Sequence, residues 1–190
     1  MIVGLSNRLV DYLSHNGVLN EDREIYVHGA GLVISTLIGT ILLLIVGAYT
    51  GHFIEAVVYE ILFSSSRSIL GGYHCKSYSH CIACYVGLFI LSVFISHLYI
   101  FHSVDRIFIE IIGLIIIGTL CPIENVNKTV STKKRKIFKR YSIIYTIIYL
   151  SIMNYLFYIH HFLGNTLVVF FIVINILIIG GKWDYEKHKS

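Results

Sequence analysis

Residues 29–50 read GAGLVISTLIGTILLLIVGAYT, a stretch in which no side chain carries a charge. As an α-helix these 22 residues would extend about 33 Å, which exceeds the roughly 30 Å hydrocarbon thickness of a bilayer. The rest of the chain has the same character, because 56% of its 190 residues are hydrophobic and its mean hydropathy is +0.75. A soluble domain of this composition would be difficult to keep in solution. The sequence therefore predicts an integral membrane protein.

Four further apolar segments predict five more spans, and they cover residues 53–66, 81–101, 107–120 and 141–181. Glu55 and Glu60 interrupt the first of them, so we expect that helix to face the protein interior or to lie partly in the interface. The last segment has no charged residue and is long enough for a hairpin of two helices that turns near residues 160–165. We find no internal repeat and no linker, which predicts a single all-α domain, residues 1–190, with about six transmembrane helices.

The N-terminal segment, residues 1–24, places apolar residues at roughly helical spacing among polar ones, which predicts an amphipathic helix at the membrane surface. We expect it to be retained, because it lacks the short apolar region and cleavage site of a signal peptide. Placing both termini in the cytoplasm leaves only Arg106, of 15 Lys and Arg residues, outside. This multi-pass arrangement in the cell membrane puts two predicted loops, 67–80 and 121–140, on the cytoplasmic side.

Groups able to carry chemistry gather between the second and third predicted spans: His74, Cys75, His80, Cys81 and Cys84. A thiol attacks a carbonyl carbon as its thiolate, and histidine is the side chain best suited to act as base near neutral pH. If the third span begins near Ser79, Cys81 lies in its first turn, where unpaired N–H groups and the helix dipole favour a thiolate. Cys81 is therefore a candidate nucleophile and His74 its candidate base.

The seven-residue spacing of His74 and Cys81 restricts the backbone conformation between them. On one continuous helix, seven residues would separate His74 and Cys81 by about 10.5 Å along the axis, too far for proton transfer. Gly71 and Gly72 supply flexibility just before this segment. We predict that His74 and Cys81 lie on different local elements, and His80 ranks second as base because adjacent side chains diverge.

Other interpretations of the cluster stay open on these residues alone. A cysteine and a histidine seven apart also arise by chance or by packing, because a buried cysteine behaves as a small hydrophobe. Cys81 and Cys84 have the C-x2-C spacing of zinc sites, but no second ligand pair is evident, so we expect no metal. The alternative function is a non-enzymatic metal-binding or small-solute membrane transporter, and a third is a membrane scaffold.

Two separated motifs add to this pattern. The first comprises Arg67, Gly71, Gly72, His74 and Cys81, and the second is residues 121–128, CPIENVNK, with Glu124, Asn127 and Lys128. Together they resemble the accessory gene regulator B (AgrB) family, the integral membrane peptidases of Gram-positive quorum sensing, whose Pro-x-Glu-x-x-Asn-Lys segment precedes a basic loop. The chain departs from the family by Cys75 after His74, where a small residue is commoner, and by Thr129, where proline is usual.

The resemblance implies a cysteine endopeptidase that removes the C-terminal part of a small AgrD-like propeptide through a thioester on Cys81, with His74 as base. It also implies closure of the remaining peptide into a thiolactone or lactone ring. The expected partners are this propeptide and the lipid bilayer, and a homodimer is compatible with the interior glycines. We expect no cofactor and no nucleic-acid partner.

The basic segment, residues 133–140, has six charged residues in eight positions. Such a segment orients a membrane protein and binds lipid headgroups. A sharper interpretation is that it also attracts an acidic propeptide tail. The predicted substrate-binding residues are Arg67, Gly71, Gly72, Lys133, Lys134, Arg135 and Lys136.

Overall fold

The computed structural model describes residues 2–15, 23–73, 75, 77–123, 132–159 and 162–189, with main chain only at 132–134 and 188–189. Seven helices occupy this part of the chain: α1 (Ile2–His15), α2 (Arg23–Thr50), α3 (Phe53–Ile69), α4 (Tyr78–Leu98), α5 (Ser103–Leu120), α6 (Thr132–Tyr158) and α7 (Phe162–Lys189). No strand occurs among the described residues. The all-helical prediction is confirmed.

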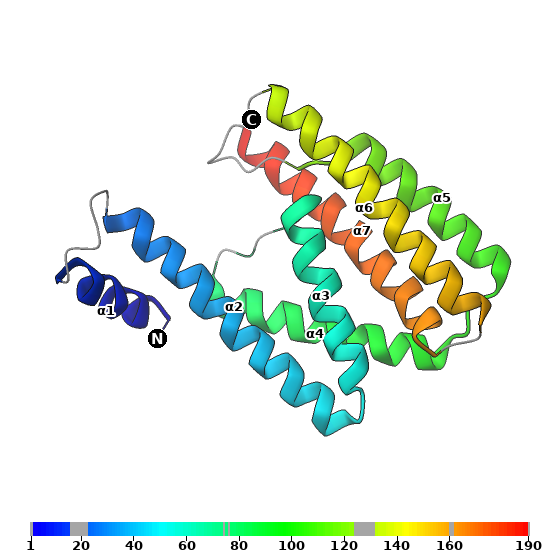
Figure 1. The fold of residues 1–190 in the computed structure, drawn as a ribbon, viewed down its shortest axis with the longest axis horizontal. Coiled ribbons are helices and arrows are strands. Elements are labelled where there is room, and N and C mark those ends of the chain that lie inside the picture. Colours follow the sequence, from blue (N-terminus) through cyan, green and yellow to red (C-terminus); the bar gives the residue numbers. More distant parts are fainter. Residues whose placement is uncertain are drawn as a thin grey trace.

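Helix α7 is the centre of the bundle, and it packs against α3, α4, α5 and α6 (Figure 1). In its most apolar stretch 67% of the residues are buried inside the protein, against 17% in α2. A helix that is apolar on every side and buried by its neighbours forms a core, whereas α2 presents its leucines and isoleucines to lipid. Gly113 of α5 allows the ring of Phe171 to approach closely, because any Cβ there would collide with it.

Within the part of the chain that the structure describes, four helices are long and apolar enough to cross a membrane: α2, α4, α6 and α7. The weak predicted span, α3, has 17 residues and a length of about 26 Å. Its Glu55 is buried and Glu60 accepts a hydrogen bond from Tyr85, so these carboxylates face the protein, the first of the two alternatives that the sequence left open. In α5, Arg106 lies 3.4 Å from Glu110 and 4.7 Å from the Phe157 ring centroid. The count of six spans stays a prediction.

The amphipathic N-terminal segment is helical over Ile2–His15, as predicted. It packs on α2 with Ile2, Ser6 and Val10 buried, and Arg23 at the start of α2 forms an ion pair with Asp11 at 2.7 Å. Its location at a membrane surface stays a prediction. The predicted hairpin over residues 141–181 is also present, since α6 and α7 pack against each other and α6 ends at Tyr158.

Two predicted loops are shorter than expected. The basic segment, placed in a loop extending to residue 140, is helical from Thr132 onward, because lysine and arginine favour a helix and no breaker interrupts them. Arg135 and Lys136 therefore lie exposed on the first turns of α6. Of the predicted catalytic loop, Arg67 belongs to the last turn of α3, and residues 78–80 form the first turn of α4.

Candidate active site

Cys81 lies at the N-terminal end of α4, close to the predicted position. Ser77 caps this helix, since its Oγ accepts a hydrogen bond from the N–H of His80 at 3.3 Å. The N–H of Cys81 donates to the carbonyl of Ser77 at 3.0 Å. The N–H groups of Tyr78 and Ser79 have no preceding helical carbonyl to bond, so they point out of the positive end of the helix.

Arg67 reaches Cys81 from the end of α3. Its Nη1 lies 4.0 Å from the Cys81 sulfur, and its Nη2 donates to the carbonyl of Tyr73 at 3.2 Å. The guanidinium also lies 5.5 Å from the centroid of the Phe63 ring. Arg67 thus brings a positive charge next to the Cys81 sulfur. The sequence predicted a substrate-binding role for Arg67 and did not predict this contact.

Gly71 and Gly72 turn the chain between α3 and α4 with φ values of +79° and +147°, which other residues rarely adopt. The loop lies directly on α7: the Tyr73 N–H donates to the carbonyl of Leu177 at 3.1 Å. A Cβ on Gly181 would lie 2.6 Å from the carbonyl carbon of Gly72. Backbone therefore contacts backbone here, and glycine is required on both sides.

The two motifs that are some fifty positions apart in sequence meet at this loop. The N–H of Ile123 donates to the carbonyl of Leu70 at 3.1 Å, and a Cβ on Gly71 would lie 2.9 Å from the Ile123 oxygen. Cys121 is buried, and this burial raises the pKa of its thiol to about 12. Cys121 is thus a packed, protonated group beside the loop.

Several predicted site residues lie outside the part of the chain that the structure describes: His74, Glu124, Asn127 and Lys128, together with the side chains of Lys133 and Lys134. Their positions relative to Cys81 stay predictions. The placement of His74 and Cys81 on different local elements also stays a prediction. The residues on either side of His74, Tyr73 and Cys75, are not helical, whereas Cys81 lies in α4.

The remaining thiols and His80 differ from Cys81 in their surroundings. Burial raises the pKa of the Cys75 thiol above its ordinary value, and the neighbouring Cys81 and Cys84, the latter through a hydrogen bond, act in the same direction. Cys75 is therefore held as a thiol. The Nδ1 of His80 lies 2.5 Å from Ser77 Oγ, so that ring is engaged by the helix cap; its second rank as base stays a prediction.

Tyr78 fixes the first turn of α4 against α2. Its hydroxyl lies 3.5 Å from Nδ1 of His28, and a Cβ on Gly31 would lie 2.5 Å from that hydroxyl oxygen. A cavity of about 310 Å³ opens beside Tyr78, between α1 and α2, with Arg23 and Glu24 in its wall. The thiol thus has an open, partly charged space close to its helix.

The model of the family described as Accessory gene regulator B matches residues 6–180 of this chain. The chain belongs to the AgrB family. A protein of Clostridium perfringens (strain SM101 / Type A), named only as AgrB-like, is 30% identical over 173 residues, which cover 87% of this chain and 80% of that protein. A second AgrB-like protein, from C. perfringens (strain 13 / Type A), is 32% identical over 144 residues, covering 70% and 66%. No solved structure matches the chain.

Family membership and the four apolar helices together identify a membrane protein of a family that takes part in agr quorum sensing with a propeptide. Among the described residues, Ile123 of the second motif contacts Leu70 and Gly71 in the loop between α3 and α4, which carries the glycines of the first motif. That loop is the candidate active site.

Proposed function

We propose that this AgrB protein is a membrane cysteine endopeptidase that cleaves a small propeptide and promotes its cyclisation, with Cys81 as nucleophile and His74 as base. The observation that carries the proposal is the 4.0 Å contact between the Arg67 guanidinium and the Cys81 sulfur at the N-terminal end of α4. A guanidinium and a helix N-terminus both favour a sulfur anion, which is the attacking species.

The reaction has two steps. The Cys81 thiolate attacks the propeptide carbonyl, the C–N bond breaks as His74 protonates the leaving amine, and a thioester on Cys81 remains. A thiol or hydroxyl of the bound peptide then attacks this thioester, forming the ring and returning the Cys81 thiol. The N–H groups of Tyr78 and Ser79 are our candidates to bind the oxyanion, and Arg67 holds the thiolate.

We also propose the topology from which this chemistry follows: one domain with six spans, both termini and the loop at Cys81 on the cytoplasmic side. The excess of Lys and Arg in the inner segments supports it. In a variant with all four native cysteines changed to serine, His102→Cys should react with an impermeant thiol reagent from outside, and Lys187→Cys only after the membrane is opened. The opposite pattern would invert the topology.

The basic residues at the start of α6 are proposed to bind the acidic tail of the propeptide. Lys136 is exposed, which leaves its ammonium group accessible to lipid headgroups or to substrate. Changing Lys133, Lys134, Arg135 and Lys136 to glutamine should slow propeptide cleavage while insertion persists. Unchanged cleavage would mean that the segment orients the protein in the membrane and does not bind the propeptide tail.

The test of the function itself is an intact-mass measurement on protein purified after co-expression with a tagged propeptide. We expect a covalent peptide adduct on the wild type and none on Cys81→Ala, because the thioester forms on that sulfur. Cys75→Ala and Cys84→Ala are matched controls that remove neighbouring thiols and should retain the adduct. Cleavage by Cys81→Ala at the wild-type rate would overturn the peptidase proposal.

A further inference from the structure

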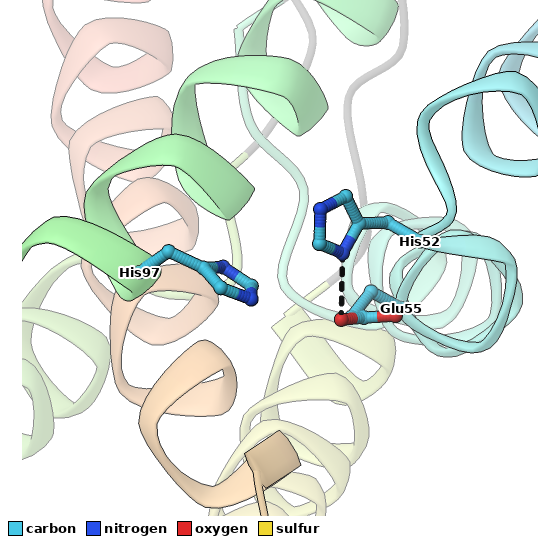
Figure 2. Close-up of side chains that lie close together, drawn as sticks. All are labelled: His52, Glu55 and His97. Atoms are coloured by element: carbon cyan, nitrogen blue, oxygen red, sulfur yellow. Dashed lines mark hydrogen bonds and ion pairs between the residues drawn. The ribbon is translucent and has the colours of Figure 1, made fainter.

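Three side chains with metal-binding atoms meet at the end of the α3/α4 pair that is remote from Cys81. His52 immediately precedes α3, Glu55 lies in its first turn, and His97 lies in the last turn of α4 (Figure 2). Cys81 and His97 are 16 positions apart on α4, which separates them by about 24 Å along the helix. The cluster is therefore independent of the candidate active site.

The geometry of the cluster suits a common ligand. Nδ1 of His52 lies 3.0 Å from Oε1 of Glu55, and the centroids of the His52 and His97 rings are 4.7 Å apart. One ligand atom from each residue lies within 4.8 Å of the other two. Two ligands on a tetrahedral zinc ion are about 3.4 Å apart, so small side-chain rotations bring these three onto one ion. Figure 2 shows both rings turned toward the carboxylate.

The charge on Glu55 needs a partner. The residue is only 5% exposed, and among the described residues its ion pair is with His52, with no Lys or Arg within ion-pair distance. An imidazole is charged only when it is protonated, so this buried carboxylate has no permanent positive charge beside it, which is unfavourable in a protein interior and more so in a membrane protein. A divalent cation shared with two histidines would neutralise it.

His97 is already oriented as a ligand. Its Nδ1 lies 2.9 Å from the carbonyl oxygen of Val93. A carbonyl can only accept, so Nδ1 carries the hydrogen and Nε2 holds the free lone pair. This bond from one ring nitrogen to a backbone carbonyl is the arrangement that fixes metal-binding histidines.

We propose that His52, Glu55 and His97 bind a divalent transition metal of the zinc class. Two imidazole nitrogens and one carboxylate oxygen are ligands typical of zinc, and three protein ligands leave a fourth position for water or another group. The ion would tie the turn between α2 and α3 to the end of α4. This site departs from the sequence analysis, which expected no metal and considered only the thiol cluster beside Cys81.

The experiment measures zinc bound to purified, metal-stripped protein in detergent. It uses a background in which Cys75, Cys81, Cys84 and Cys121 are all changed to serine, so that thiols contribute nothing. We expect one equivalent of zinc, and His97→Gln and His52→Ala should each lower the affinity at least about 100-fold. His102→Ala is the matched control, because His102 is exposed and lies on the loop that follows α4.

A second measurement does not depend on folding of the variants. Cobalt bound to the unaltered protein should give a visible spectrum typical of nitrogen and oxygen ligands, without sulfur-to-cobalt charge transfer. The proposal is overturned if zinc does not bind at excess, if binding survives His97→Gln unchanged, or if the serine background removes it.

Discussion

Cys81→Ala, His74→Ala and the double variant are each expected to lower the rate of propeptide cleavage by the same factor, about 10⁴ or more. A nucleophile and its base act as one unit, so once either is removed the other has nothing left to contribute. The measurement is the time course of cleavage of a tagged propeptide by equal amounts of membrane-inserted protein. The expected equality of single and double variants separates a catalytic pair from two residues that each support folding.

Controls for this prediction come from the same loop. Cys84→Ala removes an exposed thiol three positions from the nucleophile, and His80→Ala removes the second-ranked base; both should retain cleavage near the wild-type rate. If the double variant is slower than the wild type by the product of the two single losses, His74 and Cys81 act separately. If His80→Ala abolishes cleavage while His74→Ala does not, the base is misassigned.

Gly181→Ala is expected to lower cleavage about 100-fold without expelling the protein from the membrane. The added methyl group would lie 2.6 Å from the Gly72 carbonyl carbon and 2.7 Å from the Tyr73 nitrogen, so the loop must move off α7. The Tyr73 carbonyl in this loop accepts a hydrogen bond from Arg67, and Arg67 contacts the Cys81 sulfur. Moving the loop away from α7 should therefore also shift Arg67 relative to Cys81. A shift of about 1 Å in a reacting group costs on the order of 100-fold in rate.

The neighbouring glycine supplies a matched control. A Cβ on Gly180 would meet Tyr73 Cβ at 3.8 Å, an ordinary contact, so Gly180→Ala should cleave at close to the wild-type rate. Thermal unfolding of both variants in detergent shows whether the bundle survives. Equal losses at both positions would mean that α7 tolerates no added methyl group here and that the effect is not specific to the loop.

Much of the fold could be predicted because the length of an apolar segment can be read from consecutive residues. Helix α2 and the α6–α7 hairpin were predicted from two uncharged stretches, residues 29–50 and 141–181. A single segment in lipid can satisfy its own backbone hydrogen bonds only as a helix. Helix ends were less accurate. The start of α6 was missed because basic residues suit a cytoplasmic loop and a helix equally well.

The site could be predicted only where its residues are close in sequence. The start of α4 just before Cys81 was predicted because the helix cap and the preceding glycines lie within one short segment. The contact of Arg67 with the Cys81 sulfur could not be predicted, because it depends on how the end of α3 is placed relative to the start of α4. The same holds more strongly for His52 and His97, which are 45 positions apart and meet only through tertiary packing.

The central position of α7 has a consequence for biosynthesis. Helices α3, α4, α5 and α6 all pack on α7, yet α7 is the last of them to leave the ribosome. Before α7 is synthesised, the earlier helices can bury their polar groups only against one another or leave them facing lipid. The Tyr73 N–H, in the loop carrying Cys81, then lacks its hydrogen bond to the Leu177 carbonyl. The loop that carries Cys81 therefore reaches the position seen in the structure only after α7 has been synthesised.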